Sequence, residues 1–141
     1  MIVSEQELGA MSSLALAHMG DAVYELLVRT MLCRDGGLTA GRLHRETVRH
    51  VAAPAQARAA EKILPMLTDE ESAVFRRARN AHGHQAPKGA TPGEYHAASA
   101  LEALFGWLWL REENERIKEL FSIIMEDNDA AGRDRTDGAA P

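Results

Sequence analysis

Two carboxylates occupy unusual places in this chain of 141 residues. Asp21 follows Gly20 in the stretch LALAHMGDAVYELLVR, and Glu102 stands in ALEALFGWLWL, where nearly every neighbour is apolar. Both stretches repeat their apolar residues at the three- and four-residue spacing that predicts a helix. A carboxylate on the packed stripe of a helix is costly unless another group compensates its charge. These two residues are therefore the first candidates for chemistry.

A divalent cation shared by Asp21 and Glu102 would compensate both charges. Mg²⁺ prefers oxygen ligands, keeps several waters and needs only one or two protein carboxylates. Such an ion lowers the pKa of a bound water and stabilises charge that builds up on a phosphodiester. Gly20 and Gly106 lie beside these acids, and we interpret them as places where a metal and a phosphate approach the helices closely. The structural alternative is that both acids face solvent or pair with an arginine.

The net charge of −5 conceals an uneven distribution. Residues 29–88 contain eleven Lys or Arg and six Asp or Glu, whereas the rest of the chain contains five and fifteen. No acid occurs between Ser72 and Gly93, a segment that carries Arg76, Arg77, Arg79 and Lys88. A basic face of this kind suits nucleic acid even in an acidic protein. A merely solvated helix surface is the competing interpretation.

The elements that must position these residues are all predicted to be helices. Ala, Leu, Glu and Arg dominate the composition, which is typical of an all-α domain. TDEE and TPGE read as capping boxes that begin two of the helices. The predicted helices cover about 12–33, 40–51, 54–64, 69–81, 92–110 and 113–126. We expect one catalytic domain over residues 1–126 and a disordered tail over 127–141.

The remaining features of the sequence bear on the cellular compartment. Cys33 is the only cysteine, which excludes an intrachain disulfide framework, and we expect it to be a small core residue. The N-terminal stretch MIVSEQELGAM lacks the basic and apolar regions of a signal peptide. No apolar run is long enough to span a bilayer. We therefore expect a cytoplasmic protein without a membrane partner.

Several motifs together resemble one family. GDAVYELLVR is similar to the signature helix of the ribonuclease III family, and ALEALFGWLWL is similar to its second signature. The segments LHRETVRHVAAPAQA and LTDEESAVFRRARNAHGHQAPK resemble the Mini-ribonuclease III subgroup, which has the catalytic domain and no double-stranded-RNA-binding domain. The likeness runs from about Leu14 to Leu120, with the motifs in the expected order.

The resemblance implies a homodimeric helical bundle that cleaves double-stranded RNA and leaves 5′-phosphate ends. It implies that Asp21 and Glu102 are catalytic and bind Mg²⁺, for which Mn²⁺ can substitute. It further implies maturation of the 23S ribosomal RNA precursor as the task, with a ribosomal protein or the pre-ribosome as an additional partner. The residues expected to contact the RNA duplex, which is read mainly by its shape and phosphates, are Arg76, Arg77, Arg79, Asn80, Gln85 and Lys88.

The chain departs from the family pattern at two positions. Ala17 and Ser99 stand where fuller ribonuclease III enzymes have carboxylates, one turn before each of the two acids. These losses leave the number of bound metals open. They also leave room for two other functions, an RNA-binding helical protein without catalysis and a protein–protein adaptor that uses the helix of Trp107 and Trp109.

Overall fold

The computed structural model describes residues 2–81 and 88–139, with side chains up to residue 126. The described chain forms helices and no strand, which confirms the all-α prediction. In chain order the helices are α1 (Glu5–Ala10), α2 (Ser13–Asp35), α3 (Ala40–Val51), α4 (Ala53–Ile63), a short 3₁₀ helix (Leu64–Met66), α5 (Asp69–Arg79), α6 (Pro92–Leu110) and α7 (Asn114–Ala139). None of the helices among these residues is long and apolar enough to cross a membrane.

The predicted helix starts agree with the observed caps. Thr68 and Thr91 begin α5 and α6 with complete capping boxes, in which each threonine hydroxyl accepts from the backbone N–H three residues later. Ser12, rather than Ser13, caps α2, since its hydroxyl accepts from the Ala15 N–H at 3.1 Å. The short helix α1 lies outside the predicted helices, although Ser4 starts it with the same kind of capping box.

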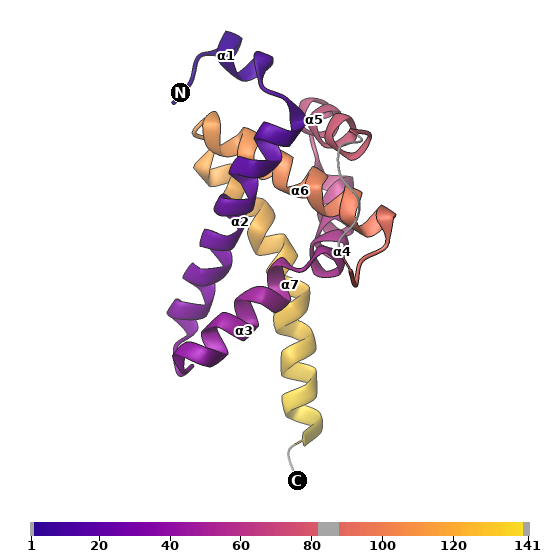
Figure 1. The fold of residues 1–141 in the computed structure, drawn as a ribbon. Coiled ribbons are helices and arrows are strands. Elements are labelled where there is room, and N and C mark those ends of the chain that lie inside the picture. The colour runs from indigo at the N-terminus through magenta and orange to yellow at the C-terminus, as the bar shows by residue number, and fades with distance from the viewer. Residues whose placement is uncertain (1, 82–87, 140–141) are drawn as a thin grey trace.

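Helix α6 is the centre of the bundle. It packs against α2, α4, α5 and α7, and most of its side chains from Ala98 to Leu110 are buried. Figure 1 shows α6 crossing between α2 on one side and α4 and α5 on the other. A helix that is apolar almost all round belongs in the middle of a core, because every face must be covered. The most apolar segment of the sequence thus positions the others.

Gly20 and Gly106 bring α2 and α6 into direct backbone contact. A Cβ atom placed on Gly20 would meet the backbone oxygen of Glu102 at 1.5 Å. A Cβ atom on Gly106 would meet the backbone oxygen of Leu16 at 2.1 Å and the nitrogen of Gly20 at 2.9 Å. The group that approaches these glycines is therefore the backbone of the facing helix, and not a metal or a phosphate. The missing side chains allow the two helices to cross at Asp21 and Glu102.

One further expectation differs from the structure. Cys33 is exposed near the end of α2, because the buried side of the helix there is the one that carries Val28 and Leu32. Helix α7 extends to Ala139, and the disordered tail expected over residues 127–141 stays a prediction. This last part of α7 extends away from the other helices (Figure 1), and the domain boundary at residue 126 stays a prediction.

Adding a methyl group at the crossing should destabilise the whole fold. We expect Gly106→Ala to lower the free energy of unfolding by about 3 kcal/mol, because two helix backbones would have to separate. Gly9→Ala is the matched control, since nothing lies within 4 Å of its new Cβ, and it should be neutral or slightly stabilising. Urea denaturation followed by circular dichroism measures both. Equal stability of Gly106→Ala and wild type would contradict the close crossing.

Candidate active site

The two predicted carboxylates meet at the crossing of α2 and α6. Asp21 is exposed on α2, Glu102 is half-buried on α6, and a hydrogen bond joins their side chains. Gly20, the neighbour of Asp21, rests against the backbone of Glu102. The contact that closes the bundle therefore also sets the spacing of the acids. One side of the pair is open to solvent, at Asp21, and the other side faces the protein interior.

The surroundings of the pair disfavour the negative charge of Glu102. Burial raises the pKa of Glu102 to about 8, and the hydrogen bond and negative charge of Asp21 add to this effect. In the absence of a cation, Glu102 thus keeps its proton at neutral pH. Because this pKa lies above the ordinary value of 4.5, the proton stabilises the fold fully at low pH, and its contribution is lost as the pH rises through about 8.

Two buried residues enclose Glu102 on its inner side. Tyr24, only 1% exposed, makes edge-to-face contacts with Phe105 and Phe121 at ring-centroid distances of 5.4 and 5.7 Å. The pKa of Tyr24 is raised by burial and, to a smaller extent, by the charge of Glu102. Gln56 of α4 acts on Glu102 from the same interior, where the nearness of its amide lowers the pKa of the carboxyl, while its Nε2 atom has no hydrogen-bond partner among the described residues. Gln56 is not among the candidate site residues named from the sequence.

A signal for Gln56 is nevertheless present in the sequence. Gln56, Ala59, Ala60 and Ile63 follow one another at helical spacing and are all buried. An amide on an otherwise apolar stripe requires a polar partner elsewhere in the fold. What the sequence lacks is the identity of that partner, because it depends on how α4 packs against α6.

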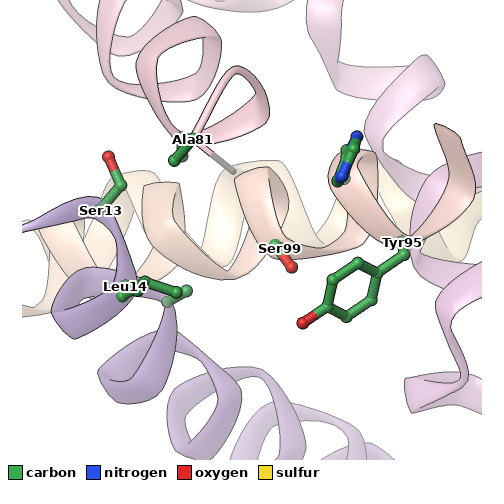
Figure 2. A pocket seen from close by; sticks show the side chains of 8 residues that line it. Ser13, Leu14, Ala81, Tyr95 and Ser99 are labelled. Atoms are coloured by element: carbon green, nitrogen blue, oxygen red, sulfur yellow. The ribbon is translucent and has the colours of Figure 1, made fainter. Parts of the chain in front are cut away.

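Ala17 and Ser99, the positions without the family's extra acids, lie together beside the pair. They line one hollow of about 20 Å³, which is space for about one water molecule. Figure 2 shows Ser99 and Tyr95 on the same side of α6, with Leu14 of α2 nearby. Two more of its lining residues, Ala78 and Ala81, come from α5 and the residues after it. The end of α5 therefore adjoins the α2–α6 crossing.

The predicted RNA-contacting residues are spread around this end of α5. Arg76, Arg77 and Arg79 are exposed on α5, and Asn80 caps its C-terminus. Lys88 is also exposed, while Gln85 lies outside the described residues. The structure thus leaves the predicted arginines exposed along the end of α5, without assigning them a ligand.

The donors at the crossing fit a hard divalent cation. The two carboxylates together offer four oxygen atoms as ligands. Mg²⁺ completes its coordination shell with oxygens of water and substrate. Within residues 2–81 and 88–126 no group of three His, Cys, Asp or Glu side chains is placed to hold a metal. Glu25, one turn beyond Asp21, instead pairs with Arg29 at 3.3 Å on the surface. Any metal here would therefore have two protein ligands and a largely hydrated shell.

Comparisons with known proteins identify the family to which the chain is similar. The family model described as the ribonuclease III domain matches residues 14–113. A Mini-ribonuclease 3 from Symbiobacterium thermophilum is 47% identical over 113 residues, which cover 80% of this chain and 87% of that protein. A Mini-ribonuclease 3 from a Thermoanaerobacter species is 36% identical over 125 residues, covering 89% of this chain and 88% of that protein.

A solved crystal structure shares the fold of this chain. The structure of a protein from Fusobacterium nucleatum superimposes with a TM-score of 0.76 at 32% identity, covering 82% of this chain and 89% of that one. The family match includes both helices of the crossing, with Asp21 and Glu102 inside it. The chain therefore belongs to the ribonuclease III family of endoribonucleases, among the Mini-ribonuclease 3 proteins.

Proposed function

We propose that this protein is a Mg²⁺-dependent endoribonuclease that cleaves double-stranded RNA at the Asp21–Glu102 pair. The observation that carries the proposal is the hydrogen-bonded pair of acids at the α2–α6 crossing, in a member of a ribonuclease family. Mn²⁺ should substitute for Mg²⁺. From the likeness to the family, the proposal includes product ends that carry 5′-phosphates. It also includes the 23S ribosomal RNA precursor as the substrate in the cytoplasm, bound together with a ribosomal protein or as part of the pre-ribosome.

Asp21 and Glu102 have different roles in the proposal because they differ in exposure to solvent. When bound, the cation activates water and stabilises the charge that develops on the phosphodiester. Asp21, exposed on α2, meets the cation and substrate from the solvent side. Glu102, half-buried on α6, anchors the cation from within and is held in place by its surroundings. Neither acid acts as a nucleophile, and the exposed Cys33 lies far along α2 from the pair.

Basic residues beside the pair supply the duplex-binding surface of the proposal. Arg76, Arg77 and Arg79 end α5, whose last turn adjoins the hollow next to the acids. Contacts to phosphates supply most of a protein's affinity for an RNA duplex when the protein does not recognise the base sequence. The same proposal includes Asn80, Gln85 and Lys88 as sugar or phosphate contacts.

A second copy of the chain is the proposed partner for the apolar surface beside Asp21. Leu26 is 60% exposed, and together with Ala22, Leu27, Trp109 and Ile117 it lines an apolar groove of about 380 Å³. Trp107, by contrast, is buried and stacks under Arg111 at 4.6 Å. Large exposed apolar residues in one groove mark an interaction site. Homodimerisation through it would place the partner next to the carboxylate pair.

Removing either acid should abolish cleavage. Wild type should cut a long RNA duplex in Mg²⁺ and not in EDTA. The cleavage rate of Asp21→Asn and of Glu102→Gln should fall at least about a thousand-fold, because the cation that stabilises the charge on the phosphodiester is no longer held. Single-turnover cleavage of labelled duplex measures these rates. Asp35→Asn, the same change at the exposed end of α2, is the control and should cut normally.

The cleavage assay also separates the other functions. RNA binding without cleavage by well-folded wild type, across Mg²⁺, Mn²⁺ and several salt concentrations, would favour the catalytically inactive RNA-binding protein. Absence of both binding and cleavage would favour the protein–protein adaptor.

Duplex affinity should depend on salt through the arginines of α5. We expect Arg76→Ala and Arg77→Ala each to weaken binding at low salt and to reduce the slope of log affinity against log salt by about 1, because each variant neutralises one phosphate fewer. Fluorescence anisotropy with Asp21→Asn protein in EDTA measures binding without cleavage. Arg34→Ala, which removes an exposed charge near the other end of α2, should leave the slope unchanged. Equal slopes in all variants would refute the proposed surface.

The apolar groove should control the oligomeric state. We expect wild type to sediment as a dimer and Leu26→Asp to sediment as a folded monomer, because a buried unpaired carboxylate opposes association. Val48→Asp is the control, since Val48 is also exposed and does not line the groove. Analytical ultracentrifugation gives the masses, and a dimeric Leu26→Asp would show that the groove is not the interface.

A further inference from the structure

We propose that Gln56 is a positioning residue that fixes the Glu102 carboxylate from the buried side, so that its remaining oxygen faces Asp21 and the cation. This inference rests on the proposed metal-dependent function and deepens it. It adds a third residue, from a third helix, to a site whose two acids come from α2 and α6.

The burial of Gln56 is the first observation. Gln56 is only 2% exposed and belongs to the buried stripe of α4, together with Ala59, Ala60 and Ile63. A methionine or leucine would fill the same space without desolvating an amide, so packing alone does not explain a glutamine. The residue needs a polar partner within the interior that α4 shares with α6.

Glu102 is the partner that the fold provides. The amide of Gln56 lies near enough to Glu102 to lower the pKa of its carboxyl. The Nε2 atom of Gln56 is buried and has no hydrogen-bond partner among the described residues, so its donor is free to complete a hydrogen bond to Glu102. An amide nitrogen can only donate, so the group it suits is a carboxylate oxygen. Among the described residues, Glu102 is the carboxylate on which Gln56 acts, so it is the acceptor that we assign to this donor.

The arrangement gives Glu102 a defined orientation. Tyr24 limits the space around the carboxyl from α2, and its own ring is held by Phe105 and Phe121. A hydrogen bond from the unpaired Nε2 atom of Gln56 to one oxygen of the carboxyl would leave the other oxygen for Asp21 and the cation. Groups that orient a metal ligand from behind commonly change metal affinity 10- to 100-fold. Gln56 is thus expected to act on metal affinity and turnover, and not on RNA affinity.

The test replaces the donor while keeping the volume. We expect Gln56→Met to bind Mn²⁺ roughly 10- to 100-fold more weakly than wild type and to lose kcat to a similar degree, with KM for the duplex unchanged. Mn²⁺ binding to the RNA-free protein is measured by electron paramagnetic resonance, which does not depend on activity. Thr47→Val is the matched control, because Thr47 is also buried and bonds only the Leu43 carbonyl of its own helix.

Unfolding in urea is measured for each variant. If Gln56→Met does not fold, Gln56→Asn gives the second measurement, since it keeps the donor but shortens its reach and should show the same loss. A folded variant with wild-type Mn²⁺ affinity and kcat would overturn the role of Gln56. If Glu102→Gln binds Mn²⁺ as wild type does, or wild type binds none, then the metal site of the proposed function fails and this inference fails with it.

Discussion

The close crossing of α2 and α6 is the constraint on which the rest of the structure depends. Two glycines, Gly20 and Gly106, let the helix backbones touch, and no other residue fits at either position. Each glycine weakens its helix by roughly 1 kcal/mol relative to alanine. The crossing regains that stability by burying most of α6, and it holds Asp21 against Glu102 as a consequence. Fold and site are thus set by one contact.

Charge is the second consequence of the crossing. Held beside Asp21 and partly buried, Glu102 keeps its proton at neutral pH, with a pKa of about 8. A divalent cation replaces that proton with two positive charges, which suits a site whose described surroundings offer no third acid. The hollow beside Ala17 and Ser99 is the size of a water molecule, so water can occupy the place of the missing carboxylates.

Much of this arrangement could be predicted from the sequence, because the signals were local. Capping boxes at Thr68 and Thr91 indicated the helix starts, and acids on apolar stripes indicated Asp21 and Glu102. Contacts between distant helices were not predictable in the same way. The close neighbour of Gly20 is the backbone of α6 rather than a ligand, and Gln56 reaches Glu102 only through the packing of α4. Trp107 and Trp109 look alike in the sequence, yet only Trp109 lines the open groove.

Anomalous diffraction from crystals soaked in Mn²⁺ tests the central claim most directly. The account predicts one strong anomalous peak at the crossing, within coordination distance of a carboxylate oxygen of Asp21 and one of Glu102, with its other ligands being water. A peak that touches only one of these acids, or Mn²⁺ bound elsewhere while the crossing stays empty, would contradict it.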